Sequence, residues 1–190
     1  PMTTGDVTDK PLRADARRNY DAILTSAKEI FACEGTGAAL EEVARAAGVG
    51  QGTLYRHFPT RDHLFVAILR ERVDQLETRA GELLGSDDPW SALVEWLRLF
   101  DQTSSRYRGL SLYIGRRLQD DDSPVAAACA PMKARFVELF DRARRQRAVR
   151  DDVAPAQVLA LIGALPKDAA GHTDPPLFDV AIAGLRRGQT

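Results

Sequence analysis

The chain has 190 residues, of which 44% are hydrophobic and 28% charged, and its formal net charge is −1 at pH 7. These values fit a globular protein with a sizeable core, and no apolar run approaches the roughly 20 residues that cross a bilayer. A net charge near zero argues against a protein that coats nucleic acid nonspecifically. The first residues carry acids and proline instead of the apolar core of a signal peptide, so we expect a cytoplasmic protein.

The first third of the chain is predicted to be helical after a short tail. Residues 1–12 lack periodicity and are expected to be disordered. A helix is predicted over residues 13–35, where apolar side chains form a single stripe and a glycine ends the pattern. Two short helical segments then flank the turn at residues 48–50, and a long helix is predicted over residues 61–84. This helix would contribute one broad apolar face to a core.

Proline after an acid or serine marks two helix starts, at Pro89 and Pro124, because proline suits the first helical position. Helices are predicted over residues 89–105, 107–119, 124–148, 155–166 and 176–187. Pro131 is expected to kink the third of these. Since no run of alternating β-branched residues occurs, the sequence predicts an all-α fold of about nine helices.

The cysteines and histidines predict neither a disulfide nor a metal site. Cys33 and Cys129 stand in apolar helical surroundings, so we expect buried free thiols. The histidines His57, His63 and His172 lack the spacing of zinc ligands. No metal and no cofactor are therefore expected.

Residues 40–58 have the spacing of a helix-turn-helix. A small Ala44 lets a second helix cross close above it, and Gly48 is expected to take the positive φ that the turn requires. The second helix would turn Leu54 and Phe58 inward, at i and i+4. An ordinary helical hairpin in a bundle has similar spacing, so spacing alone leaves both interpretations open.

The outer side of that second helix is polar and carries no acid. Its residues are Gln51, Gly52, Thr53, Tyr55, Arg56 and His57. A glutamine amide can pair with a base edge, and an arginine can bind guanine or phosphate. Hydroxyl and imidazole groups can donate to phosphates, and a glycine lets the helix N-terminus approach the groove. This surface is suited to DNA.

The motif resembles the TetR/AcrR family of transcriptional regulators over residues 17–69. The family pattern is Ala-x-x-x-Gly-Val, then Gly-Thr-Leu-Tyr-x-His/Tyr-Phe, a basic residue and a leucine. The residues that fit are Ala44, Gly48, Val49, Gly52, Thr53, Leu54, Tyr55, His57, Phe58, Arg61 and Leu64. The resemblance implies an N-terminal three-helix helix-turn-helix domain at residues 13–60. It also implies a C-terminal ligand-binding and dimerisation domain at residues 61–190, which only helix number and length support.

The resemblance also implies which residues touch DNA. Base edges are assigned to Gln51 and Arg56. Phosphates are assigned to Thr53, Tyr55 and His57, to Arg61 at the start of the next helix, and to Arg17 and Arg18 in the first helix. Two features depart from the family pattern: Ala38-Ala39 stand where a Ser or Thr cap, worth about 1 kcal/mol, is usual, and Glu41 and Glu42 disfavour base reading by the first helix of the motif.

Aromatic residues of the C-terminal part are either core or, as the resemblance implies, the lining of a cavity for a small apolar or aromatic ligand. The candidates for that cavity are Trp96, Phe100, Tyr113, Met132 and Phe136. The last two helices are apolar and rich in small residues, and the resemblance implies that they pair with their copies in a dimer. The candidates for that interface are Leu159, Ile162, Gly163, Phe178, Ala181, Ile182 and Leu185.

The expected function is that of a repressor: a homodimer that reads a palindromic operator with recognition helices about 34–36 Å apart. A ligand that fits only one position of helix 61–84 would change that separation and release the DNA. An activator, or a regulator controlled by a protein partner, would have the same sequence features. An enzyme is not expected, because the glycines at 48, 50 and 52 follow no strand and no catalytic motif occurs.

Overall fold

A computed structural model of the chain describes residues 9–104, 110–118, 120, 122–168 and 173–188. Within these residues it contains nine α-helices and no strand, which confirms the predicted all-α fold. The helices are α1 Asp9–Glu34, α2 Leu40–Ala46, α3 Gln51–His57, α4 Arg61–Leu83, α5 Pro89–Ser104, α6 Leu110–Arg117, α7 Pro124–Arg145, α8 Pro155–Gly163 and α9 Pro175–Leu185. None of the described helices is both long and apolar enough to cross a bilayer.

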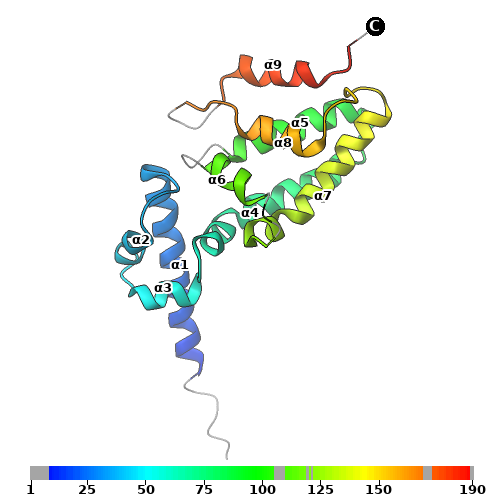
Figure 1. The fold of residues 1–190 in the computed structure, drawn as a ribbon. Coiled ribbons are helices and arrows are strands. Elements are labelled where there is room, and N and C mark those ends of the chain that lie inside the picture. Colours follow the sequence, from blue (N-terminus) through cyan, green and yellow to red (C-terminus); the bar gives the residue numbers. More distant parts are fainter. Residues whose placement is uncertain (1–8, 105–109, 119, 121, 169–172, 189–190) are drawn as a thin grey trace, which may run out of the picture.

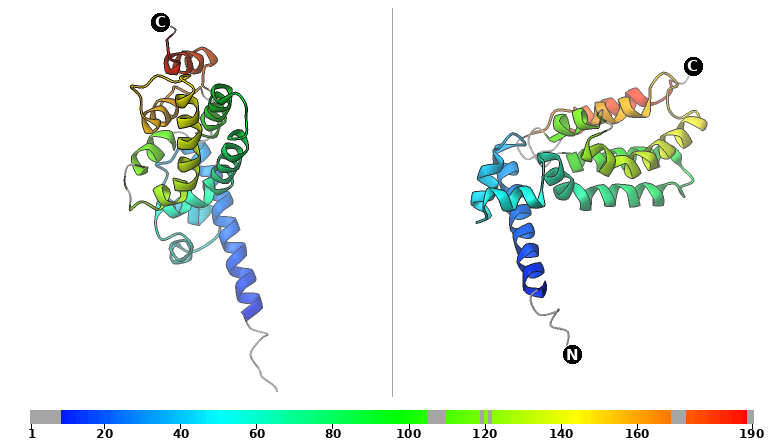
Figure 2. Two further views of the ribbon diagram at one scale, coloured as in Figure 1. Left: turned by 90° about the vertical axis from the view of Figure 1, so that its right-hand side faces the viewer. Right: turned by 60° about the horizontal axis from the view of Figure 1, so that its bottom comes forward.

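The helices form two groups (Figure 1). The helices α1, α2 and α3 make a small cluster, and α4 leads from it into a larger bundle with α5 to α9. The N-terminal half of α1 projects away from both groups in the views of Figure 2. The helix α9 lies on the side of the bundle farthest from α2 and α3 (Figure 1).

The core of the small cluster continues into two helices of the larger group. Its central residues are Ile23, Ala27, Phe31, Val43, Ala44, Leu54, Phe58, Leu64, Phe65, Ile68, Leu69 and Leu110. Four of these belong to the first half of α4, and Leu110 belongs to α6. The boundary expected between residues 60 and 61 therefore passes through a shared core.

The core of the larger bundle is aromatic at its centre. Trp96 and Phe136 are fully buried and stack with their ring centroids 4.8 Å apart. The indole Nε1 of Trp96 donates to the carbonyl oxygen of Leu76 at 2.9 Å, which satisfies its buried N–H. This hydrogen bond ties α5 to the middle of α4.

Several helix ends differ from the sequence prediction. The helix α1 begins at Asp9, so residues 9–12 are helical and not part of a tail; the rest of the predicted tail lies outside the described residues. Pro11 stands in the first turn, where a missing N–H costs nothing. The helices α7 and α8 end three residues earlier than predicted, at Arg145 and Gly163, and α9 begins one residue earlier, at Pro175. The predicted starts and ends at Ser105, Tyr107 and Gln119 lie outside the described residues.

The two thiols have different surroundings. Cys129 is buried in α7, as predicted, and its burial raises the pKa of the thiol. Cys33 is exposed, so the expectation that it is buried was wrong. The reason is the register of α1: Ala27 and Phe31 point into the core, and Cys33 lies away from that stripe.

Candidate nucleic-acid interface

The turn between α2 and α3 has the geometry that the sequence predicts. Gly48 has φ +70°, a left-handed conformation that favours glycine. The backbone N–H of Gly48 donates to Arg45 at 3.1 Å, and that of Val49 donates to Ala44 at 3.0 Å. These bonds satisfy the last carbonyls of α2 and turn the chain sharply into α3.

The inner side of the turn is buried. Ala44, Leu54 and Phe58 are each at most 2% exposed, which confirms the inward register predicted for both helices. The N-cap residue Ala39 makes no side-chain hydrogen bond, so the capping bond expected to be missing is absent at the start of α2. The orientation of α3 therefore depends on packing and on the Gly48 turn.

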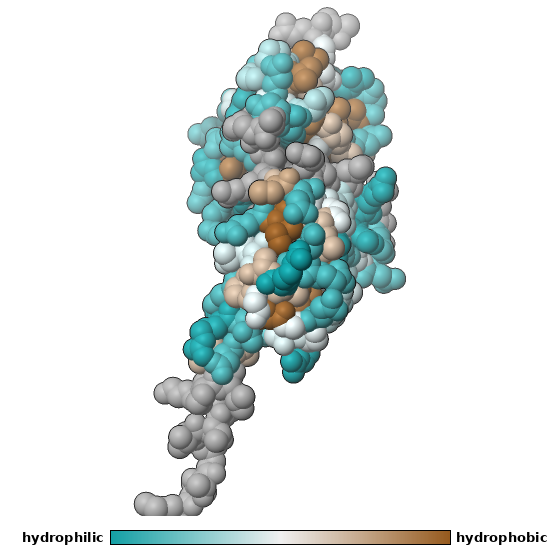
Figure 3. Space-filling model, turned by 90° about the vertical axis from the view of Figure 1, so that its left-hand side faces the viewer, coloured by the Kyte–Doolittle hydropathy of each residue, from teal (hydrophilic) through white to brown (hydrophobic). Residues whose placement is uncertain are grey.

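The outer side of α3 faces away from the protein. Gln51, Gly52, Tyr55 and Arg56 are exposed, and Thr53 and His57 are half-buried. A Cβ atom added at Gly52 would meet no atom within 4 Å apart from its chain neighbours and the nearby backbone of α3. Figure 3 shows the side of the molecule that bears α2 and α3, where hydrophilic groups surround small hydrophobic patches. The surface predicted to bind DNA is thus accessible.

Arg56 and Thr53 interact with each other on this surface. The guanidinium of Arg56 donates to the Thr53 hydroxyl at 3.1 Å and to the Gly52 carbonyl at 3.2 Å. Exposed bonds of this kind contribute little free energy, so phosphate or a base edge can replace them. His57 is placed differently: its ring meets the Tyr20 ring edge-on, with centroids 6.0 Å apart. The Tyr20 ring also packs against the Phe58 ring, with centroids 5.0 Å apart, and this packing orients Tyr20 toward His57.

Arg61, to which the resemblance assigns a phosphate, bonds the backbone of the protein itself. Its Nη1 donates to the carbonyl oxygens of Thr36 at 2.9 Å and Ala38 at 2.8 Å. The guanidinium also lies over the Phe31 ring, 5.9 Å from its centroid. Arg61 therefore joins the start of α4 to the loop between α1 and α2, because that loop offers two carbonyls with no helical partner.

This role predicts a stability effect. Replacing Arg61 with alanine should lower the free energy of unfolding by about 1–3 kcal/mol, since two part-buried carbonyls lose a charged donor. Arg70→Ala, at an exposed position of the same helix, is the matched control. Equal unfolding midpoints of the two variants in urea would contradict the assignment.

The two arginines expected at flanking phosphates lie on the exposed part of α1. Arg17 pairs with Asp21 at 3.4 Å, and Arg18 pairs with Asp15. Both pairs are solvent-exposed and weak. Their positive charge is therefore partly neutralised within α1 itself.

A polar cluster that the sequence did not predict joins the start of α4 to α6 and α7. Asp62, at the start of α4, is 8% exposed. Its Oδ1 accepts a hydrogen bond from the Tyr113 hydroxyl and lies 3.3 Å from Arg117 Nε, both on α6. Its Oδ2 accepts from the hydroxyl of Ser123, the N-cap of α7, at 3.4 Å. A single buried carboxylate thus connects α4, α6 and α7.

Tyr113 makes this cluster sensitive to alkali. Burial, together with the hydrogen bond to Asp62, raises the pKa of Tyr113 from 10.0 to about 12. The unfolded chain therefore loses this proton first, so the stabilisation is complete below pH 10.0 and disappears as the pH rises to about 12. We expect the urea midpoint of the wild type to fall more steeply over this window than that of Tyr113→Phe. Parallel curves would contradict this prediction.

Three of the five residues proposed to line a ligand cavity are buried in the core, and the other two are half-buried. Trp96, Met132 and Phe136 are each at most 3% exposed, and Tyr113 belongs to the Asp62 cluster. Phe100 stacks on Trp96 at 5.6 Å. None of the five lines either of the two cavities described below. Large aromatic residues fill the space between helices as well as lining cavities, so their place in the sequence does not distinguish the two roles.

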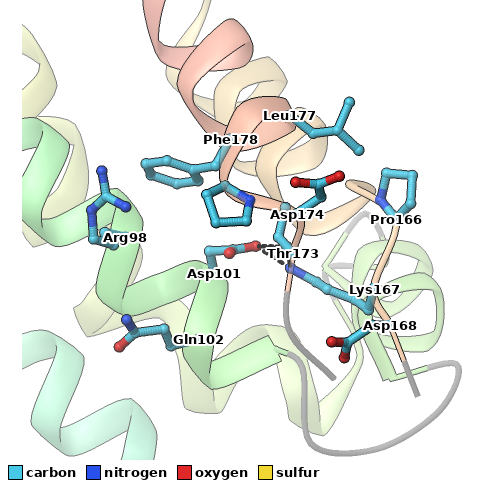
Figure 4. Close-up of a pocket in the computed structure, with 11 residues that line it drawn as sticks. Arg98, Asp101, Gln102, Pro166, Lys167, Asp168, Thr173, Asp174, Leu177 and Phe178 are labelled. Carbon is cyan, nitrogen blue, oxygen red and sulfur yellow. Dashed lines mark hydrogen bonds and ion pairs between the residues drawn. The ribbon is translucent and has the colours of Figure 1, made fainter. Parts of the chain in front are cut away.

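The two cavities lie elsewhere in the larger bundle. One, of about 170 Å³, lies between α4 and α7 and includes Val73 and Cys129 in its lining. The other, of about 770 Å³, lies between α5 and the segments before and within α9 (Figure 4). Its polar residues come from parts of the chain about 70 residues apart, so no local sequence pattern marks them.

The residues proposed for the dimer interface mostly face inward. Leu159, Ile162, Phe178, Ile182 and Leu185 are buried within the protomer, and Gly163 and Ala181 are half-buried. The same helices expose a second apolar set: Leu161 at 45%, Leu177 at 40% and Val180 at 70%. The assignment chose the stripe that covers the core. The sequence signal that could have indicated this second face is the weaker stripe of apolar and small residues opposite the core.

Comparison with known protein families gives two matches. Residues 23–68 match the family described as bacterial regulatory proteins, tetR family. Residues 88–187 match the SbtR-like transcriptional regulator C-terminal domain. Together the matched stretches include α2, α3 and the helices α5 to α9.

The relatives of the chain are regulators. The HTH-type regulator SAR0097 of Staphylococcus aureus is 33% identical over 81 residues, or 41% of this chain and 42% of that protein. RutR of Escherichia coli is 33% identical over 109 residues, which are 56% of this chain and 51% of RutR. The chain thus matches only about half the length of these curated relatives.

Solved structures extend the similarity to most of the chain. The TetR regulator SCO0520 of Streptomyces coelicolor is 30% identical, with a TM-score of 0.52, over 90% of this chain and 99% of that one. AibR, solved with isovaleryl coenzyme A and operator DNA, is 21% identical, with a TM-score of 0.58. That match covers 90% of this chain and all of AibR, and it shows similarity of fold.

Proposed function

The chain belongs to the tetR family of bacterial transcriptional regulators, and we propose that it is a cytoplasmic repressor that binds a palindromic operator as a homodimer. The observation that carries this proposal is the exposed, acid-free face of α3, whose opposite side packs on the buried core beside the α2–α3 turn. That face offers amide, hydroxyl, imidazole and guanidinium groups to a major groove. DNA binding is assigned to α1–α3 with the start of α4, and ligand binding and dimerisation to the rest of residues 61–190.

Individual residues of α3 should contribute differently to binding. Gln51, at the exposed start of α3, is assigned to a base edge, and Tyr55 to a phosphate. We therefore expect Gln51→Ala to reduce the preference for operator over scrambled duplex about tenfold. Tyr55→Phe should weaken binding to both duplexes alike. Fluorescence anisotropy at matched salt measures both ratios, and identical ratios for the two variants would contradict the assignment.

The exposed apolar residues of α8 and α9 support the proposed dimer. Leu161 lies between Ala160 and Ala164 on the outer side of α8, and Leu177 and Val180 lie on the outer side of α9. Small residues beside larger apolar ones let two copies approach closely and bury the patch. Because one α3 reads few bases, a two-fold pair is needed for a specific operator.

The shared core supports control of DNA binding by a ligand. The first half of α4 packs with α1–α3, whereas its second half packs in the bundle. A ligand that prefers one arrangement of the bundle helices would move the start of α4, and the recognition helix with it. AibR, which shares the fold, has been solved with a small molecule and operator DNA together.

Selection of DNA from a random pool by the full chain tests the proposed function. We expect the recovered sequences to contain an inverted repeat, with half-sites about 10–10.5 base pairs apart or a multiple of this. Recovery of no preferred sequence at low salt, or of one asymmetric half-site, would overturn the proposal. The experiment requires no knowledge of the regulated gene.

A further inference from the structure

The smaller cavity, of about 170 Å³, lies at the middle of α4, where the two cores of the protein meet. Its walls come from residues 66–74 of α4 and residues 125–129 of α7. Leu69 belongs to the core shared with α1–α3, Leu76 belongs to the core of the bundle, and Val73 packs against both. A molecule in this cavity would therefore contact α4 between the part that packs with α1–α3 and the part that packs in the bundle.

The floor of the cavity is apolar. Its buried members are Leu69, Val125 and Cys129, and its half-buried members are Val66, Val73 and Ala128. Burial raises the pKa of the Cys129 thiol, which keeps this side chain uncharged at neutral pH. An apolar cavity of about 150 Å³ engineered into another protein stays dry and binds benzene. The floor therefore suits an apolar group about as large as a benzene ring.

Two opposite charges lie at the mouth of the cavity. Arg70 and Asp74 are the exposed members of its lining, so they mark the side that opens to solvent. Their spacing along α4 places them one turn apart on the same face of the helix. Neither forms a hydrogen bond or an ion pair with another residue that the structure describes. The guanidinium and the carboxylate are both available to a ligand.

The two charges together favour a ligand that carries both signs. A simple anion would pair with Arg70 and meet the like charge of Asp74, and a simple cation would meet the reverse arrangement. A molecule with a carboxylate and an ammonium group can pair each of them with its opposite. Because exposed ion pairs contribute little free energy, the apolar group inside the cavity supplies the rest of the affinity.

We propose that this cavity binds an amino-acid-like zwitterion. Its carboxylate pairs with Arg70, its ammonium group pairs with Asp74, and its apolar side chain, no larger than a benzyl group, fills the space between α4 and α7. A ligand held in this way favours one position of α4 relative to α7. The proposal names an effector class for the proposed regulator, so its regulatory meaning rests on that function. Binding itself does not require DNA.

Three probes with the same phenylethyl skeleton test the proposal. L-phenylalanine carries both charges, 2-phenylethylamine lacks the carboxylate, and 3-phenylpropionate lacks the ammonium group. Isothermal titration calorimetry is performed on the full chain without DNA, so that failure of DNA binding cannot be confused with failure here. We expect phenylalanine to bind about fivefold more tightly than either analogue. Equal affinities, tightest binding of a singly charged analogue, or no binding of any probe would overturn the proposal.

Charge-neutralising variants assign each charge to its partner. Arg70→Gln should weaken the binding of phenylalanine about fivefold without weakening that of 2-phenylethylamine. Asp74→Asn should weaken the binding of phenylalanine about fivefold without weakening that of 3-phenylpropionate. Glu71→Gln neutralises an exposed charge of α4 outside the lining and should change none of these affinities. An equal loss in Glu71→Gln, or no loss in the other two variants, would overturn the assignment.

Filling the cavity tests where the probes bind. Ala128→Leu adds a bulky side chain to the lining and should abolish the binding of all three probes. Ala127→Leu, at the neighbouring exposed position of α7, should bind them as the wild type does. Retained binding in a folded Ala128→Leu protein would overturn the proposed location. Circular dichroism shows whether this variant is folded, and the Arg70 and Asp74 variants, which change exposed residues, decide the question if it is not.

Discussion

Val180→Asp is expected to split the proposed dimer and to weaken operator binding by about a thousandfold. Val180 is 70% exposed in α9, between Leu177 and the small residues Ala183 and Gly184. In a two-fold interface the substitution would bring two new carboxylates into an apolar contact, where they could not be paired. A monomer would keep one recognition helix and fall to the level of nonspecific binding.

The matched control is Val137→Asp on α7, where a valine is 39% exposed on another face of the bundle. It should remain dimeric and bind the operator as the wild type does. Sedimentation velocity measures the oligomeric state, and fluorescence anisotropy measures the affinity for the selected operator. A Val180→Asp protein that sediments as a dimer with unchanged affinity would exclude α9 from the interface.

Asp62→Ala is expected to have the largest effect on stability, a loss of about 3 kcal/mol in the free energy of unfolding. The substitution leaves the hydroxyls of Tyr113 and Ser123 without their acceptor and Arg117 without its ion pair. The adjacent residue, Arg61, bonds the loop between α1 and α2. A displaced start of α4 would therefore also displace this loop, and we expect the operator affinity to fall.

Asp62→Asn separates hydrogen bonding from charge, since it keeps one oxygen acceptor, and should lose only about 1 kcal/mol. Asp74→Ala, at an exposed position of the same helix, controls for the loss of an acid from α4. Urea unfolding measures all three variants. If Asp62→Ala and Asp74→Ala unfold at the same urea concentration, the Asp62 cluster does not stabilise the packing of α4 against α6 and α7.

Local features of the fold and of the α3 surface could be predicted from the sequence. The positive φ of Gly48 and the inward positions of Leu54 and Phe58 depend on neighbours within a few residues. The predicted helix bounds lie close to the observed ones for a similar reason, because proline and glycine mark helix starts and ends locally. Once Leu54 and Phe58 are placed on the inner side of α3, the other side chains of the helix must form its exposed face.

The side-chain partners of charged residues could not be predicted, because they are distant in the chain. Arg61 bonds carbonyls 25 and 23 residues earlier, and Asp62 bonds Tyr113, 51 residues later. An arginine at the start of a helix resembles a phosphate ligand until the loop beside it is known.

In the C-terminal helices the sequence pattern has two apolar faces, and it does not say which of them forms an interface. In α8 and α9 the strongest apolar stripe, which includes Ile162 and Phe178, covers the protomer's own core. The exposed stripe that includes Leu161 and Val180 is weaker in composition and was overlooked. Amphipathic periodicity identifies the buried side of a helix, and an interface between copies needs the opposite side as well.

The most direct test of the central claim, that the outer face of α3 enters the major groove, is photo-crosslinking to the selected operator. A benzophenone-bearing phenylalanine analogue is placed at Tyr55, which is 41% exposed on α3, or at Val137, similarly exposed on α7. We predict crosslinks to operator DNA from position 55, lost with excess unlabelled operator, and none from position 137. Absence of crosslinks from position 55 under conditions in which the operator is bound would contradict the account.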